Sequence, residues 1–161
     1  MSLYKVYLAG YISGNKLLKC IEWRKQIREH YDNWKGEERY PISWLDPLNG
    51  QLLESINDTG LKSSIPETAF IHRDYKCVKD CDLLIANLDT FGETRPLTGT
   101  IYELAWAWLE HKPTIIITNE SNYLKHPFIT STASVIVKDI DELLSSKTIN
   151  YFFKGSVSAI Y

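Results

Sequence analysis

The residues best placed for chemistry are a glutamate and the strand and helix expected around it. Residues 82–89 are almost continuously apolar between their ends, and segment 99–105 carries Glu103 three residues after Thr100. Such a run is typical of a buried strand in a parallel sheet, and ligands collect where such strands lead into helices. A carboxylate in the first turn of that helix is stabilised by the helix dipole. We therefore expect Glu103 to be ionised at neutral pH and able to act as a nucleophile.

The same spacing has a purely structural alternative. With Thr100 as the N-cap, Glu103 occupies the position of a capping box and folds back onto the backbone N–H of Thr100. The spacing alone leaves both interpretations open.

Four residues are expected to meet at one end of the predicted sheet. Tyr7 lies near the end of the first strand, Asp74 lies in the helix before the next main strand, and Glu103 opens the helix after it. Tyr161 brings a phenol and the terminal carboxylate. In retaining glycosyl chemistry one carboxylate attacks the anomeric carbon while a second acid about 5 Å away protonates the leaving group. The set therefore suits glycosyl transfer, with a phenol holding the nucleophile in place.

The elements that position these residues follow from periodicity. Apolar runs predict strands over 4–9, 42–45, 82–88, 114–118 and 133–137, and helical spacing predicts helices over 16–31, 70–79, 99–111 and 139–145. The alternation predicts an α/β fold, a single domain over 1–161 with a flavodoxin- or Rossmann-like parallel sheet and helices on both faces. On the first helix the charged residues are expected to face outward. They are Lys16, Lys19, Arg24, Lys25, Arg28 and Glu29.

Two segments fall outside this alternation. Residues 34–61 are irregular, and the embedded Trp44 and Leu45 favour an ordered flap. The tail 149–161 is rich in aromatic residues, which is unusual for a disordered terminus and indicates that it docks on the domain.

Composition excludes several classes of function. The chain has 161 residues with 18 basic and 20 acidic side chains, so it lacks the basic surface of a protein that binds nucleic acid or an anionic membrane. Three cysteines and the absence of a secretory pattern near the start favour a cytoplasmic setting. Cys77 and Cys81 are four residues apart, but no neighbouring histidine or cysteine completes a metal site. We expect neither a metal nor a cofactor.

Several motifs in these elements resemble those of the nucleoside 2-deoxyribosyltransferase family, which includes a branch of 2-deoxynucleoside 5-monophosphate N-glycosidases. The resemblance lies in Val-Tyr-Leu-Ala-Gly at 6–10, Arg-Asp at 73–74 followed by 81–88, Gly-Thr-Ile-Tyr-Glu-Leu-Ala-Trp-Ala at 99–107, and Lys-Pro at 112–113. It spans most of the chain. The Gly-Thr-x-x-Glu element is its most specific part.

The resemblance implies a role for each candidate residue. Glu103 matches the family's nucleophile, Asp74 the acid that protonates the departing base, and Tyr7 the phenol bonded to the nucleophile. Tyr161 matches the terminal residue that closes the site. The candidate substrate contacts are Gly10, Trp44, Asp46, Gln51, Asn87, Thr98, Gly99 and Tyr161.

The chain departs from the family pattern two residues before Gly99, where members often carry an aspartate that holds the sugar. Leu97 stands there, with Thr98 and Arg95 beside it, so the sequence leaves open whether the substrate is a nucleoside or a monophosphate. Transfer between bases, hydrolysis, and binding of nucleotides without turnover all remain open. The implied partners are 2-deoxynucleosides, free nucleobases and further copies of the chain, with Trp106, Trp108, Phe152 and Phe153 as candidate subunit contacts.

Overall fold

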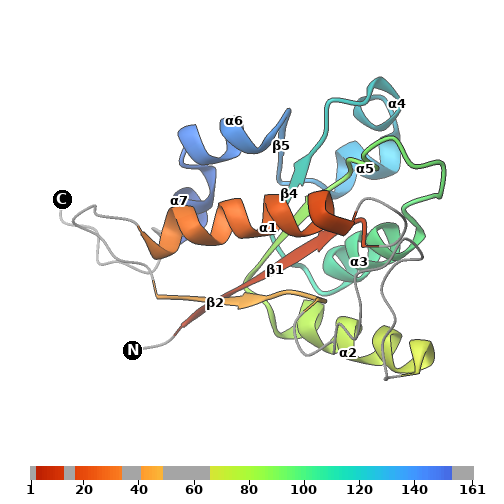
Figure 1. Cartoon of the computed structure of the whole chain (residues 1–161), viewed down its shortest axis with the longest axis horizontal. Helices are drawn as coiled ribbons and strands as arrows, with labels where there is room; N and C mark the ends of the chain where they lie inside the picture. The colour runs from red at the N-terminus through yellow and green to blue at the C-terminus, as the bar shows by residue number, and fades with distance from the viewer. Residues whose placement is uncertain (1–2, 13–16, 34–40, 49–65, 154–161) are drawn as a thin grey trace.

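Five parallel strands run through the centre of the computed structural model (Figure 1), which describes residues 3–12, 17–33, 41–48 and 66–153. The strands are β1 (Tyr4–Gly10), β2 (Ile42–Leu45), β3 (Leu83–Asn87), β4 (Thr114–Ile117) and β5 (Val135–Val137), and they lie in the order β2-β1-β3-β4-β5. This is the flavodoxin-like order, in which β1 and β3 flank the point where the connections switch faces. The predicted α/β fold is confirmed.

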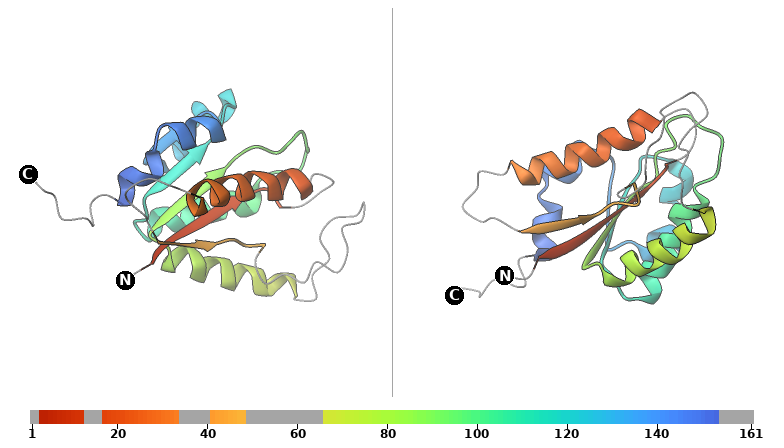
Figure 2. Two further views of the ribbon diagram at one scale, coloured as in Figure 1. Left: turned by 60° about the vertical axis from the view of Figure 1, so that its left-hand side comes forward. Right: turned by 60° about the horizontal axis from the view of Figure 1, so that its bottom comes forward.

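Helices cover both faces of the sheet (Figure 2). On one face lie α1 (Leu17–Asp32), α6 (Ile140–Ser145) and α7 (Thr148–Phe153). On the other lie α2 (Glu67–Asp80), α3 (Thr98–Leu109) and α5 (Pro127–Thr132). The short α4 (Ser121–Leu124) adjoins α5.

Strand β1 shows how the two-sided burial arises from the pleat. Val6 and Leu8 pack in the core beneath α1, whereas Tyr7 and Ala9 pack in the core beneath α2 and α3. Because successive side chains point to opposite faces, a strand covered on both sides is apolar throughout. Tyr7 therefore faces α3, the helix that carries Glu103.

The long elements match their sequence predictions, but three short helices were missed: α4, α5 and α7. Helix α7 seats part of the predicted docking tail, since Phe153 is buried and its ring lies 4.5 Å from that of Tyr4. Phe153 is therefore not exposed for subunit contact. Trp108 on α3 is 57% exposed, and Trp106 is half-buried against Tyr75.

One prediction for α1 is wrong. Arg24 is fully buried instead of facing outward, because the polar atoms it contacts lie at the end of β1 and beyond β2. Among the helices in the described part of the chain, none has both the length and the apolar character required to cross a bilayer.

Candidate active site

A hydrogen bond between β1 and α3 forms the centre of the site. The Tyr7 hydroxyl donates to Oε1 of Glu103 over 2.6 Å, and both side chains are buried. The two residues are 96 positions apart in the chain. Their pairing therefore depends on β1 lying beside β3 and on α3 folding back over that pair of strands.

The capping alternative for Glu103 is wrong. Helix α3 begins at Thr98 with Leu97 as its N-cap, and no side chain caps it. Glu103 consequently lies in the second turn, not in the first as we expected, and its oxygen accepts a hydrogen bond from Tyr7. The backbone N–H of Ile101 already bonds to the carbonyl oxygen of Leu97, so the first turn is closed by the backbone.

The expectation that Glu103 is ionised at neutral pH is also wrong. Its pKa is raised from 4.5 to about 8, chiefly because burial penalises the charged form. The Tyr7 hydroxyl lowers the pKa, the negative charge of Asp74 raises it, and the guanidinium groups of Arg24 and Arg73 lower it. Burial outweighs the favourable contacts, and the proton remains on Glu103 near pH 7.

The second carboxyl, Asp74, lies on α2 and is partly shielded from solvent. Nε and Nη2 of Arg73 donate to its Oδ1 at 3.1 and 3.0 Å. Burial raises the pKa of Asp74, and Arg73 opposes that rise. Asp74 also raises the pKa of Tyr7, for which burial is the largest cause and Glu103 the next, so the phenol stays protonated and able to donate.

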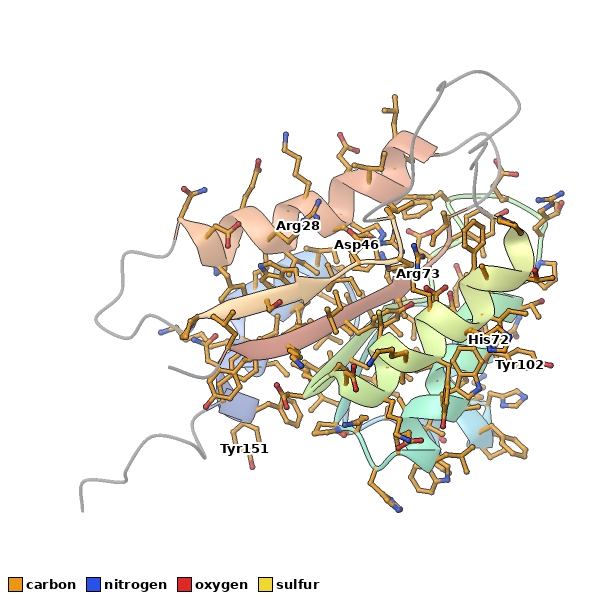
Figure 3. All side chains as sticks on the ribbon, turned by 90° about the horizontal axis from the view of Figure 1, so that it is seen from below. Arg28, Asp46, His72, Arg73, Tyr102 and Tyr151 are labelled. Carbon is orange, nitrogen blue, oxygen red and sulfur yellow. The ribbon has the colours of Figure 1, made fainter. Side chains whose placement is uncertain are left out.

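Arginines from two helices meet the short turn after β2 (Figure 3). Asp46 at this turn forms ion pairs with Arg24 and Arg28, each at 3.4 Å. It also accepts a hydrogen bond from the backbone N–H of Leu48 at 2.9 Å. From α2, Nη2 of Arg73 donates to the carbonyl oxygen of Pro47 over 2.6 Å. The turn is therefore tied to α1 and to α2.

The remaining candidate residues lie at different places. Trp44 packs in the core beneath α1, 6.0 Å from the ring of Tyr31, on the face of the sheet opposite to Glu103. Asn87 pairs with Gly10 between β1 and β3, and its side chain accepts the N–H of Asp89 at 3.0 Å.

Two candidates, Thr98 and Gly99, are exposed at the start of α3, where Leu97 is buried. Gln51 and Tyr161 lie outside the described residues, so their placement stays a prediction.

Sequence reasoning missed the part that two arginines play. Arg24 was assigned to a solvated face, and Arg73 was noted only as part of the Arg-Asp motif at 73–74. A signal was available for Arg24, since it lies three residues before Ile27 and four after Cys20 on the apolar stripe of the helix.

Residues 6–148 match the sequence model of a family described as nucleoside 2-deoxyribosyltransferase. The match includes β1 from Val6 onward and all of α2 and α3, the elements that carry Tyr7, Asp74 and Glu103. The chain belongs to the nucleoside 2-deoxyribosyltransferase family. Comparison with curated protein sequences gave no match.

Solved structures share the fold of this nucleoside 2-deoxyribosyltransferase family member. A conserved protein from Enterococcus faecalis V583 superposes with a TM-score of 0.62 at 19% identity, covering 92% of this chain and 99% of its own. The CMP N-glycosidase of Clostridium botulinum gives 0.54 at 19% identity over 90% and 98% of the two chains. A 2-desoxiribosyltransferase from Leishmania mexicana gives 0.57 at 14% identity over 96% and 99%.

Proposed function

We propose that the protein transfers 2-deoxyribose between nucleobases by a retaining double displacement. Glu103 attacks C1′ of a 2-deoxynucleoside, the bond from C1′ to the base nitrogen breaks, and the base leaves with a proton from Asp74. The sugar is then held as an ester on Glu103. A nitrogen of a second base attacks C1′ and loses its proton to the ionised Asp74, the ester bond to Glu103 breaks, and a new nucleoside forms.

The observation that carries this proposal is the buried pair of Tyr7 and Glu103 at 2.6 Å, with Asp74 close enough to affect the pKa of both. A phenol that donates to one carboxyl oxygen fixes the rotation of the side chain and leaves the other oxygen to attack. Two carboxyl groups in one electrostatic unit are the minimum that a retaining glycosyl transfer requires.

The proton has to change places during the reaction. In the free protein it rests on Glu103, and Asp74 carries the negative charge that helps to hold it there. Attack at C1′ needs the charge on Glu103 and the proton on Asp74. Tyr7 and Arg24 favour that exchange because each stabilises the ionised form of Glu103. Arg73 stabilises the ionised forms of both carboxyl groups, so it does not drive the proton toward Asp74. The active form carries one proton across the pair, so the rate is expected to fall as the pH passes about 8.

The test is an exchange reaction with one 2-deoxynucleoside and a different free base, followed by mass spectrometry. Transfer yields a new nucleoside that carries the second base. Free deoxyribose without a new nucleoside would show a hydrolase instead, and binding without product would show a module that does not turn over. Glu103→Gln is the control variant, and it is expected to form neither product. Full activity in that variant would contradict the proposed nucleophile.

Specificity at the sugar 5-position is tested in the same assay. Leu97 is buried and apolar, so it offers no hydrogen bond where the family pattern often has an aspartate. A deoxynucleoside and its 5-monophosphate are therefore supplied in parallel, and the ratio of their kcat/KM values identifies the preferred form. A preference for the monophosphate with release of free sugar phosphate would favour the N-glycosidase alternative.

A further inference from the structure

Arg24 is a fully buried cation whose guanidinium contacts backbone carbonyl oxygens and one carboxylate. Nη1 donates to the carbonyl oxygen of Cys20 at 2.6 Å and to that of Tyr11 at 3.5 Å, and Nη2 donates to the carbonyl oxygen of Gly10 at 3.1 Å. Nε lies 3.4 Å from Oδ1 of Asp46. The planar group also lies over the ring of Trp23, with its central carbon 4.5 Å from the ring centroid.

These contacts join separate elements at one edge of the sheet. Gly10 is the last residue of β1 and Tyr11 follows it, and Asp46 follows β2 directly. Removing an arginine from water costs free energy, and its buried ion pairs and hydrogen bonds often do no more than offset that cost. Net stability is therefore a weak reason for the chain to bury Arg24. What Arg24 does supply is a fixed spacing between the ends of β1 and β2.

The close approach of α1 requires a glycine at the end of β1. A Cβ on Gly10 would lie 2.8 Å from Cζ2 of Trp23 and 3.5 Å from Nη2 of Arg24. The absence of a side chain therefore makes room for the Trp23 ring, against which the Arg24 guanidinium lies, whereas the 3.5 Å to Nη2 is an ordinary contact. The same strand, three residues earlier, carries Tyr7, which bonds to Glu103 on the other face of the sheet.

We propose that Arg24 is a positioning residue of the reaction, which fixes the Gly10–Tyr11 backbone and the Asp46 turn and adds a positive charge on the α1 side of the sheet. This inference rests on the proposed function in one respect, namely that Glu103 must ionise to react. The groups that act most on Glu103 are the Tyr7 hydroxyl, which donates a hydrogen bond, and the charges of Asp74 and Arg73 on α2 and of Arg24 on α1. Arg24 is the contributor from the face opposite to α2 and α3.

The experiment measures the pKa of Glu103 directly by NMR of protein labelled with ¹³C at the glutamate carboxyls. The resonance of Glu103 is assigned by its loss in Glu103→Gln. In Arg24→Met the pKa is expected to rise by about one unit, because a nearby cation is lost. Arg24→Gln, also neutral, serves if the Met variant does not fold, and Arg24→Lys is expected to restore the pKa to near that of the wild type.

The matched control is Arg28→Met. Arg28 pairs with the same Asp46 at the same distance, but it is partly exposed and is not one of the largest influences on the pKa of Glu103. Its substitution should leave the pKa of Glu103 where it is. An unchanged pKa in a folded neutral variant of Arg24 would overturn the inference, and so would an equal shift in Arg28→Met.

Kinetics test the positioning part. Arg24→Lys keeps the positive charge but loses the planar guanidinium that bonds several carbonyl oxygens at once. We therefore expect kcat/KM to fall about tenfold, while the alkaline limb of its pH profile stays where it is in the wild type. Wild-type kcat and KM in that variant would overturn the positioning role. If the wild type itself forms no product, the proposed function fails, and the NMR titration still decides what Arg24 does to Glu103.

Discussion

Replacing Glu103 by Gln removes one ionisable group, while the side chain keeps its size and an oxygen that can accept the Tyr7 hydroxyl. The substitution should abolish activity and stabilise the protein. The reason is that the pKa of Glu103 is about 8 in the folded chain against 4.5 for an ordinary glutamate. Between these pH values the folded protein binds more protons than the unfolded chain, so the stability of the wild type falls as the pH rises.

The size of the effect follows from the two pKa values. One unit corresponds to about 1.4 kcal/mol, so ionisation of Glu103 costs the wild type about 1 kcal/mol at pH 5 and about 4 kcal/mol at pH 8. The Gln variant does not bear this cost. For a protein of this size 1 kcal/mol corresponds to roughly 2–4 °C, so the Tm difference in favour of the variant should grow by about 9 °C between pH 5 and pH 8.

The assay is thermal unfolding followed by circular dichroism at several pH values from 5 to 8. Glu22→Gln, at an exposed position of α1, is the control, and its Tm should run parallel to that of the wild type. A difference between wild type and Glu103→Gln that does not grow with pH would refute the reasoning. It would mean that Glu103 ionises in the folded protein as it does in water.

Three further outcomes are expected. Tyr7→Phe removes the hydrogen bond that favours ionised Glu103, so the alkaline limb of kcat/KM should move up by about one unit and the rate at pH 7 should fall at least tenfold, measured in a pH series. Asp46→Ala leaves the buried charge of Arg24 without its counter-ion and should lower the free energy of unfolding by about 3–5 kcal/mol in urea. We expect the chain to self-associate through the exposed Trp108 of α3, so Trp108→Glu, which places a charge there, should reduce the molecular mass found by light scattering. A monomeric wild type would contradict self-association.

The hydrophobic patterns along the chain correctly predicted the five strands and the helices α1, α2, α3 and α6. The runs that became β1, β3 and β4 are apolar on both faces because helices cover both sides, and this makes them visible without any structure. The short helices α4, α5 and α7 have too few turns for a periodic stripe to be recognised. Buried residues hold α5 and α7 in place, whereas α4 has none.

The contact between Tyr7 and Glu103 was predicted, but the protonation state of Glu103 was not. The bond between Tyr7 and Glu103 was inferred through family resemblance, since no spacing rule links residues so far apart. The ionisation of Glu103 was misjudged because the sequence shows the nearby helix start but not the burial, and burial is the largest cause of the shift. Arg24 was misplaced for a related reason, since a charged residue is assigned to the surface unless its buried partners are known.

The distance along the chain between Tyr7 and Glu103 has a consequence for how activity is acquired. A contact that closes a loop of 96 residues forms only after the central strands have found their partners, and such long-range pairing is the slow part of folding for parallel sheets. Helices α1 and α2 are local and can form earlier. After dilution from denaturant, recovery of the proposed turnover should therefore lag behind recovery of helical signal, because the Tyr7–Glu103 contact forms only when the native topology is complete.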